Sequence, residues 1–276
     1  MPADPTAARR ERWALVTGAS RGIGAAYARR LAALGYGVLL IARDRERLEA
    51  VAAELTRRHK TPVLIDTLDL SLSDAAHRLY AMTRDHGVVP DILINNAGFG
   101  LYGPFVDLPM VRIQAMLRVH INTVVETTRL FLPSMIERRS GAIINVASTA
   151  GFVPAPFLTE YGATKAFLIR FSEALAEEVR VHGIRVQACC PDTTTETDFH
   201  ATANFHVFNP LGASTATRVA ERSLDALAHD RVVVTMGWRG AAVDLLGRWA
   251  PRRWLARRAG RWLAPSPPGG SGHDRS

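Results

Sequence analysis

Short apolar runs alternate with longer amphipathic stretches along most of this 276-residue chain. An apolar run of about four to seven residues bounded by turn residues is typical of a buried strand, whereas apolar positions that recur every three or four residues indicate a helix. The predicted strands cover residues 13–17, 38–42, 63–66, 92–95, 142–146, 184–190 and 232–235. The predicted helices cover residues 25–34, a charged segment that ends near 58, and 73–86, 110–136, 160–182 and 217–228.

This alternation predicts a protein of the α/β class. Strands that alternate with helices form right-handed βαβ units, in which the strands pair in parallel and the helices cover both faces of the sheet. We therefore expect one doubly wound domain over residues 10–236, with a mainly parallel seven-stranded sheet. Residues 1–9 are expected to be a flexible N-terminus, 237–263 a helical basic appendage, and 264–276, rich in Pro, Gly and Ser, a disordered tail.

The composition is that of a soluble globular protein, with 47% hydrophobic and 22% charged residues. No run of about 18 uncharged apolar residues occurs, so we expect no transmembrane helix, and the polar, basic start of the chain does not resemble a signal peptide. The only two cysteines, Cys189 and Cys190, are adjacent within a predicted strand. That placement argues against a disulfide framework and a metal site, and a cytoplasmic location is expected.

Positive charge is concentrated near the C-terminus. The net charge is +8, and residues 237–263 contain seven arginines and one aspartate. The rest of the chain is close to neutral, which argues against nucleic-acid binding. Apolar residues recur at helical spacing beside a row of arginines: Leu255, Ala259 and Trp262 beside Arg253, Arg257 and Arg261. Such a helix favours contact with an anionic membrane surface; the alternatives are a helix that packs on the domain over a cleft or joins a subunit interface.

A glycine-rich turn joins the first predicted strand to the first predicted helix. It reads Thr17-Gly18-Ala19-Ser20-Arg21-Gly22-Ile23-Gly24. Glycines in such a turn let the backbone approach a pyrophosphate, which then rests at the N-terminal end of the helix. The position of the turn, after a strand and opening a helix, favours dinucleotide binding over a plain connecting turn.

The end of the second predicted strand indicates which dinucleotide is bound. In folds that bind NAD, an acidic residue about 20 residues beyond the glycines holds the ribose 2′-hydroxyl. Here Ala42 stands where that acid is expected, and Arg43 follows it. The guanidinium groups of Arg43 and Arg21 could bind a 2′-phosphate. The sequence therefore predicts NADP(H) rather than NAD(H); the alternative is that Arg43 is a solvated residue at the start of a helix.

Tyr161 and Lys165 are four residues apart on a predicted helix and so share one face. An ordinary tyrosine has a pKa near about 10, and a neighbouring ammonium is expected to lower the pKa of Tyr161. The phenol could then exchange a proton with a carbonyl or alcohol oxygen. A surface pair is the alternative, but only Lys60 and Lys165 among the 34 basic side chains are lysines. Arginine would be a poor partner in proton transfer.

Two further polar residues complete the predicted catalytic set. Ser148 follows the strand predicted at 142–146, at the sheet edge where α/β folds bind ligands, and its hydroxyl could hold a substrate oxygen. Asn122 lies within the helix predicted over 110–136, where it could bind a water that connects Lys165 to solvent. The alternatives are a turn serine and an exposed asparagine.

Together these segments resemble the short-chain dehydrogenase/reductase family. The matching segments are TGASRGIG at 17–24, NNAG at 95–98, Asn122, NVAS at 145–148 and YGATK at 161–165, in the family's order over about residues 12–236. The resemblance implies a Rossmann-type fold and an NADP(H)-dependent oxidoreductase with Asn122, Ser148, Tyr161 and Lys165 as its catalytic tetrad.

The resemblance also implies further contacts to the cofactor. Asp69 and Leu70 resemble the pair that contacts the adenine, and Asn96 to Gly98 would line the adenosine. After the sixth predicted strand the family usually has Pro-Gly and then a threonine that contacts the nicotinamide amide; here Asp192 replaces the glycine, so Thr193 or Thr194 is expected to make that contact. The complete set of expected cofactor contacts is Gly18, Ser20, Arg21, Gly22, Ile23, Gly24, Arg43, Asp69, Leu70, Asn96, Ala97, Gly98, Tyr161, Lys165, Pro191, Thr193 and Thr194. No metal ligand is expected.

Mostly apolar residues occupy the loops after the later strands: Phe99, Leu101, Tyr102, Phe152, Val153, Phe157, Phe199, Phe205, Val207 and Phe208. They predict a hydrophobic carbonyl or alcohol substrate; the alternative is that several only pack beneath the loops.

By family analogy the helices 110–136 and 160–182 pair across a two-fold axis, in a homodimer or homotetramer. A non-catalytic NADP(H)-binding sensor or scaffold would have no need of both Tyr161 and Lys165. An epimerase or dehydratase would carry sugar-nucleotide contacts, of which the sequence shows no sign.

Overall fold

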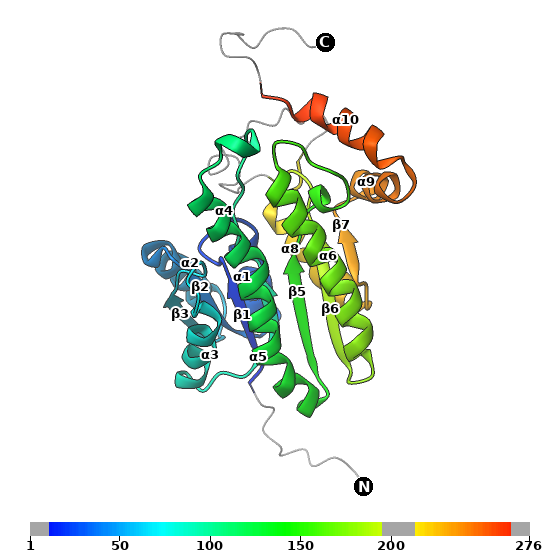
Figure 1. The fold of residues 1–276 in the computed structure, drawn as a ribbon. Helices are drawn as coiled ribbons and strands as arrows, with labels where there is room; N and C mark the ends of the chain where they lie inside the picture. The colour runs from blue at the N-terminus through cyan, green and yellow to red at the C-terminus, as the bar shows by residue number, and fades with distance from the viewer. Residues whose placement is uncertain (1–10, 195–212, 266–276) are drawn as a thin grey trace.

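The computed structural model describes residues 11–194 and 213–265. Seven strands form one sheet in the order β3-β2-β1-β4-β5-β6-β7 (Figure 1). Every neighbouring pair of strands is parallel, which confirms the predicted doubly wound α/β architecture. The strands are β1 (Trp13–Thr17), β2 (Gly37–Ala42), β3 (Val63–Thr67), β4 (Pro90–Asn95), β5 (Gly141–Val146), β6 (Ile184–Cys190) and β7 (Val233–Thr235).

Helices cover both faces of the sheet, as the near-continuous apolar strands require. The α-helices are α1 (Gly22–Ala33), α2 (Arg45–Arg58), α3 (Ala75–Asp85), α4 (Met110–Leu117), α5 (Thr123–Arg138), α6 (Thr159–Arg180), α8 (Ala216–Ala228), α9 (Trp238–Trp249) and α10 (Arg252–Leu263). Successive residues of β1 point to opposite faces: Ala14 and Val16 pack with α1, α2 and α8, whereas Leu15 packs with α3, α5 and α6.

The helix predicted over residues 110–136 is interrupted. A π-helical turn, Arg118–Asn122, separates α4 from α5. A π turn places an extra residue within the helix and changes which side chains face inward, and such turns are frequent at functional sites. The sequence pattern has a regular helical period through this point, so the interruption was not predicted.

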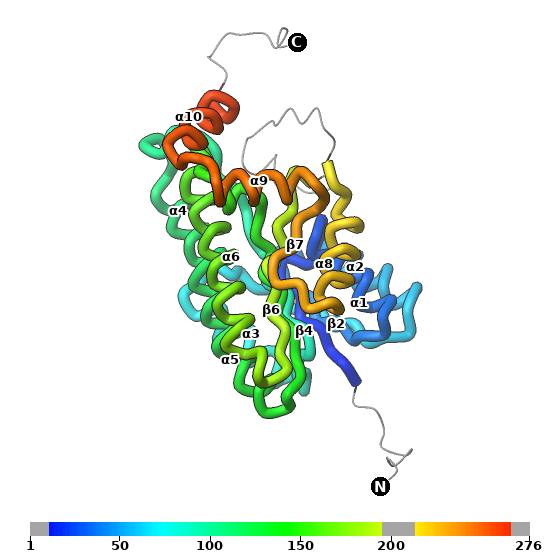
Figure 2. The backbone as a smooth tube through the Cα atoms, turned by 90° about the vertical axis from the view of Figure 1, so that its right-hand side faces the viewer, coloured from blue at the N-terminus to red at the C-terminus, as the bar shows by residue number. Residues whose placement is uncertain are grey.

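The expected C-terminal appendage consists of two helices. α9 and α10 lie at the carboxyl ends of the strands, above β7 and α6 (Figures 1 and 2). This is the edge of the sheet where the glycine turn and the loops that follow β4 and β5 also lie. The predicted flexible N-terminus, most of the predicted tail and the substrate-loop residues Phe199, Phe205, Val207 and Phe208 lie outside the described residues.

Candidate active site

The turn between β1 and α1 closes so tightly that it requires glycine. Gly18 and Gly22 have positive φ angles of 65° and 54°, a region that favours glycine. A Cβ atom on Gly24 would lie only 2.2 Å from the carbonyl oxygen of Gly18. Ser20 is half-buried within the turn, and Ile23 packs on the core beneath it. The first N–H groups of α1 are thereby presented at the sheet edge, an arrangement that suits a phosphate.

The segment after β4 holds this turn in place. The Asn96 side-chain amide donates to the carbonyl oxygens of Thr17 at 2.8 Å and Gly18 at 3.2 Å. In return, Thr17 Oγ1 accepts hydrogen bonds from the backbone N–H groups of Asn96 and Ala97, at 2.9 and 3.1 Å. These contacts suit a cofactor site formed jointly by the segments that follow β1 and β4.

Three guanidinium groups gather beside the turn, next to the end of β2. Partial burial lowers the pKa of Arg21, the positive charges of Arg47 and Arg43 lower it further, and Asp44 acts in the opposite direction. Asp44 also caps α2, because its Oδ1 accepts from the N–H of Arg47 at 3.1 Å. Arg47 Nε is paired with Asp44 Oδ2 at 3.1 Å, so Arg21 and Arg43 are the cations of this group that an added anion such as a 2′-phosphate would stabilise.

Asp69 and Leu70 lie at the same edge, after β3. Burial raises the pKa of Asp69, but hydrogen bonds from Ser71 and the charge of Arg43 outweigh it, so that the pKa lies below the ordinary value. The carbonyl oxygen of Leu70 accepts from Thr123 Oγ1 at 2.8 Å. This segment is thus fixed to α5 and lies within electrostatic reach of Arg43.

Ser148, Tyr161 and Lys165 come together beyond the carboxyl end of β5. A hydrogen bond joins the side chains of Ser148 and Tyr161. Lys165 Nζ donates to the carbonyl oxygen of Val146 at 2.7 Å and lies 5.5 Å from the centroid of the Tyr161 ring. The structure therefore brings together three of the residues expected to be catalytic.

Burial dominates the acidity of this pair. It raises the pKa of Tyr161 to about 12, although the hydrogen bond with Ser148 acts in the opposite direction. The expectation of a lowered pKa is therefore wrong, because burial disfavours the phenolate more than the hydrogen bond with Ser148 favours it. Burial also lowers the pKa of Lys165 to about 8. Tyr161 as a whole is half-buried, and its phenol is protonated at neutral pH.

Asn122 has an exposed side chain in the π turn, whereas His120, two residues earlier, is buried and contacts the Tyr161 ring edge-on at a centroid distance of 5.9 Å. Residues two apart on a helix face nearly opposite directions, so the two side chains leave the helix on different sides. The catalytic role expected for Asn122 stays a prediction. His120 is a residue next to Tyr161 that the sequence did not point to.

His120 has a partner at each ring nitrogen. Nδ1 lies 2.9 Å from Thr164 Oγ1, and Nε2 accepts from the backbone N–H of Phe99 at 3.1 Å. The Thr164 hydroxyl donates its only proton to the carbonyl oxygen of Tyr161 at 2.8 Å, so His120 Nδ1 must carry the proton in the contact with Thr164. Gly98 leaves room for the ring, since a Cβ there would lie 2.6 Å from Nε2.

Apolar side chains surround Tyr161 on two sides. One cluster contains Leu101 and Phe99, packed on α4, and the other contains Tyr102 and Phe157, packed on α10; Tyr161 contacts both. Phe152 packs instead on a third cluster, beside β6, and Val153 is half-buried near it. Part of the expected apolar set thus lies around the candidate catalytic phenol.

Hydrogen bonds fix the segment after β6 to its neighbours. Pro191 is buried, and its carbonyl oxygen accepts from the N–H of Thr149 at 3.0 Å. Thr193 accepts from Ser214 N–H at 3.0 Å, and Thr194 forms a bridge with Ser214. The Asp192 side chain also hydrogen-bonds to Ser214. Both threonines expected near the nicotinamide are therefore held at the carboxyl edge of the sheet.

Comparisons with known proteins agree with this geometry. A family model described as short chain dehydrogenase matches residues 12–206. The very-long-chain 3-oxoacyl-CoA reductase of Macaca fascicularis is 39% identical over 183 residues, which cover 65% of this chain and 58% of that relative.

Two solved structures resemble the whole fold. A short-chain dehydrogenase from Sphingobium yanoikuyae in complex with NADPH has a TM-score of 0.78 and 29% identity, covering 95% of this chain and 99% of that one. A bulky-bulky ketone specific alcohol dehydrogenase from Comamonas testosteroni has a TM-score of 0.74 and 26% identity, covering 95% of this chain and 97% of that one. The chain belongs to the short-chain dehydrogenase/reductase family.

Proposed function

We propose that this protein is an NADP(H)-dependent oxidoreductase that transfers a hydride to or from the carbonyl or alcohol carbon of a hydrophobic small molecule. The observation that carries the proposal is the meeting of Ser148, Tyr161 and Lys165 at the same sheet edge as the glycine turn. Family membership supports an NAD(P)-dependent enzyme that acts on C=O or CH–OH groups.

Each of the three side chains has a role that its surroundings support. A bound nicotinamide would supply or accept the hydride. The Ser148 hydroxyl holds the substrate oxygen, and Tyr161 donates a proton to that oxygen during reduction. The positive charge of Lys165, 5.5 Å from the ring centroid, stabilises the phenolate that remains. The pKa of the free Tyr161 phenol, about 12, keeps it protonated at neutral pH, so it can donate that proton during reduction.

The cofactor would bind across the glycine turn. The N-terminus of α1 would receive the pyrophosphate, Asp69 and Leu70 the adenine, and Arg21 with Arg43 a 2′-phosphate. Asn96 would act by holding the turn through its bonds to Thr17 and Gly18. The close approach between Gly24 and Gly18 and the three clustered guanidinium groups support this assignment.

The substrate is proposed to be hydrophobic because the described side chains that pack around Tyr161 are mostly apolar or aromatic. The similarity to a very-long-chain 3-oxoacyl-CoA reductase and to a bulky-bulky ketone specific alcohol dehydrogenase supports large carbonyl compounds as substrates.

NADPH oxidation measured against a panel of carbonyl compounds tests the proposal. The panel contains bulky aromatic ketones, a steroid ketone, a long-chain 3-oxoacyl thioester and small charged keto acids, each with wild type and Tyr161→Phe. We expect turnover of the hydrophobic members, lost in the variant. A preference for charged keto acids would contradict the substrate class, and NADPH binding without any turnover would favour a sensor or scaffold.

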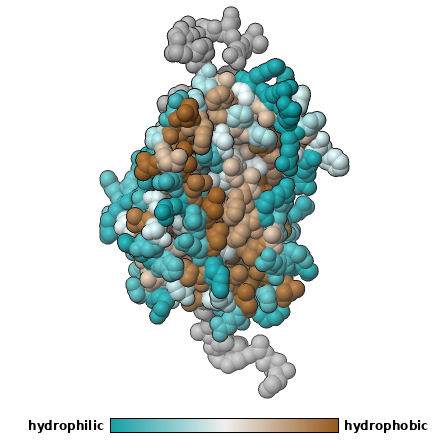
Figure 3. Space-filling view, viewed as in Figure 1, coloured by the Kyte–Doolittle hydropathy of each residue, from teal (hydrophilic) through white to brown (hydrophobic). Residues whose placement is uncertain are grey.

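Assembly and location belong to the same proposal. Figure 3 shows hydrophobic side chains gathered along the middle of the face that α5 and α6 present. On α6, Phe167 is exposed and stacks on Phe171 at a centroid distance of 5.7 Å. This face suits pairing with a second copy in a homodimer or homotetramer. A Phe167→Glu variant should then have a smaller mass by light scattering.

The protein is further proposed to be cytoplasmic and to contact a membrane surface through residues 237–263.

A further inference from the structure

Helix α9 presents large apolar residues to solvent and glycines to the protein. Trp238, Leu245 and Trp249 lie on one helix face, at spacings of seven and four residues, and are 74%, 59% and 81% exposed. The inward side carries Gly240 and Gly247, and a Cβ on Gly247 would lie 2.2 Å from the carbonyl oxygen of Phe152. An ordinary surface helix has the opposite arrangement, so the outer face of α9 suits an apolar partner.

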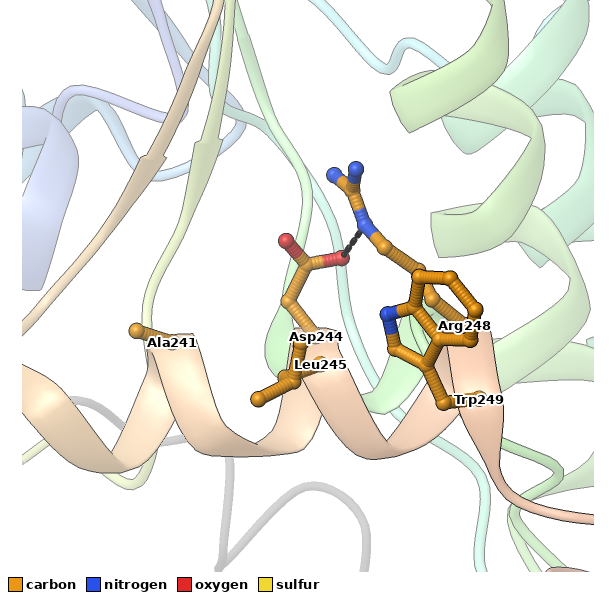
Figure 4. A pocket seen from close by; sticks show the side chains of 5 residues that line it. All are labelled: Ala241, Asp244, Leu245, Arg248 and Trp249. Atoms are coloured by element: carbon orange, nitrogen blue, oxygen red, sulfur yellow. Dashed lines mark hydrogen bonds and ion pairs between the residues drawn. The ribbon is translucent and has the colours of Figure 1, made fainter.

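Figure 4 shows a surface hollow at this face of α9, lined by Ala241, Asp244, Leu245, Arg248 and Trp249. Asp244 is the only acidic residue between residues 237 and 263. Its Oδ1 is bonded to Arg248 Nε at 2.9 Å. The sole negative charge of the face is thus neutralised by its own neighbour.

Helix α10, which follows α9, carries positive charge on its exposed side. Five exposed arginines lie on it: Arg252, Arg253, Arg257, Arg258 and Arg261. No ion pair among the described residues engages any of them, and Arg258 lies over the ring of Trp254 at 5.9 Å. Trp254 and Trp262 are 51% and 66% exposed. Tryptophan and arginine side by side match the boundary between lipid headgroups and acyl chains.

We propose that the outer face of α9 and α10 docks on an anionic lipid surface. A second copy of this chain is a poorer occupant, because a two-fold contact would place the same unpaired arginines opposite one another. The described part of the chain contains no helix with the length and hydropathy of a membrane span.

Docking would also bring the active site to the lipid. The inner face of α10 buries Leu255 and Leu263, and Tyr102 Oη donates to the carbonyl oxygen of Leu263 at 2.7 Å. Leu263 and Tyr102 belong to the cluster that contains Tyr161. A hydrophobic substrate dissolved in the bilayer would then reach the site beside α10. This last step rests on the proposed carbonyl reduction, whereas docking itself does not.

Co-sedimentation of the full chain with vesicles tests the docking. We compare phosphatidylcholine vesicles with vesicles that also contain phosphatidylglycerol, at low and high salt. Wild type is expected to bind the anionic vesicles at least about tenfold more tightly, and salt should weaken this binding. The double variant Trp238→Ser/Trp249→Ser and the triple variant Arg253→Gln/Arg257→Gln/Arg261→Gln should each lose most of it. The matched control is Val181→Ser, which removes an exposed apolar side chain, 62% exposed, after α6.

Each outcome has a distinct meaning. Equal binding to neutral and anionic vesicles, or no binding, overturns the proposal. A change in mass of the tryptophan variant by light scattering, without lipid, would instead assign the face to a second copy. Anionic vesicles should also lower the KM for a membrane-partitioned ketone but not for a small soluble one. Docking without any NADPH oxidation would leave this inference standing and overturn the proposed reaction.

A second inference rests on His120. We infer that His120 is a positioning residue. Its two hydrogen bonds keep the ring neutral and hold the segment after β4, which supports the glycine turn, at a fixed position relative to Tyr161. It joins Phe99, directly after the segment that holds the turn, to Thr164 on α6. Protonation would place two N–H groups head to head at Phe99. Burial, and then the charge of Lys165, accordingly lower the pKa of His120 well below its ordinary value.

Three variants separate this role from simple packing. His120→Phe keeps the ring but loses both bonds, His120→Asn can keep a donor toward Thr164, and His120→Gln can keep an acceptor for Phe99. We expect His120→Phe to lower kcat about tenfold or more, with little change in the KM of the ketone, and the two amide variants to restore part of it. A merely structural role would lower the melting temperature and leave kcat per folded molecule unchanged; that result, or wild-type kcat in His120→Phe, would overturn the inference.

Discussion

The two ends of the candidate site are built in different ways. At the cofactor end, the shape is set by backbone atoms: Gly24 packs on the Gly18 carbonyl, and Asn96 bonds to the same turn. At the catalytic end, the shape is set by buried side chains, with Lys165 and His120 around Tyr161. The charges differ as well, since Arg21 and Arg43 are exposed whereas Lys165 is buried.

This difference decides how each end can fail. A backbone cradle tolerates no added atom, but its exposed charges are screened by water and salt. A buried side-chain site tolerates changes of shape poorly and also shifts the pKa of every group in it. Substitutions at the catalytic end should therefore act on kcat, and those at the cofactor end on cofactor affinity.

The largest effect is expected from Tyr161→Phe, which keeps the ring and its apolar contacts but removes the proton donor. General acid catalysis contributes roughly 10²–10⁴-fold, so kcat for ketone reduction should fall by about that factor. NADPH affinity, measured by fluorescence, should change little. Retained kcat would show that another group supplies the proton. A loss of NADPH affinity without a loss of kcat would contradict the prediction that the catalytic end acts on kcat.

Gly24→Ala tests the cofactor end. The new Cβ would lie 2.2 Å from a backbone oxygen that cannot move without opening the turn. We expect NADPH affinity to fall by at least about tenfold, with overpacking costing roughly 1–3 kcal/mol of stability. Gly87→Ala is the control, because that glycine also limits substitution, through a φ of 66°, but has open space around it. Equal losses of NADPH affinity in both variants would mean that the turn has no special role.

Arg43→Ala should give a smaller and more selective effect. Loss of one exposed guanidinium beside a 2′-phosphate is expected to weaken NADPH binding by about tenfold and leave NADH binding unchanged. Arg45→Ala is the matched control, since Arg45 is exposed on α2 and paired with Glu49 at 2.8 Å. If both variants weaken NADPH and NADH binding alike, Arg43 does not recognise the phosphate.

The sequence predicts the cofactor end better than the catalytic end, for a physical reason. Only glycine fits at Gly18 and Gly24, so the chemistry of the turn is visible in the residues themselves. The inward position of His120 could not be derived, because the π turn at Arg118–Asn122 leaves no mark on the hydrophobic pattern.

Two other features also depended on tertiary structure. The pKa of Tyr161 was misjudged because the helical spacing places Lys165 nearby but does not reveal how deeply both are buried. The sheet and its helices followed from the apolar strands, whereas the reversed orientation of α9 depends on Gly240 and Gly247 packing on neighbours distant in sequence.

The smallest predicted effect is the pH dependence of reduction, and it concerns the catalytic end alone. The pKa of Lys165 is lowered to about 8, so the side chain is charged below that pH and neutral above it. Because the proposed mechanism needs the positive charge beside the phenolate, kcat should be highest below pH 8 and fall as the pH rises through about 8. Tyr161, with a pKa of about 12, stays protonated over this range and does not contribute to the fall.

Lys165→Arg sharpens the assignment, since a guanidinium keeps its charge at every pH of the experiment. Its kcat should be lower throughout, because the larger group fits the buried space poorly, but the decrease near pH 8 should disappear. The same decrease in this variant would assign the titration to another group. NADPH binding depends mainly on the exposed arginines and the glycine turn, so the NADPH affinity should vary far less than kcat over this range. A change of pH would then affect the catalytic end and leave the cofactor end nearly unchanged, without any substitution.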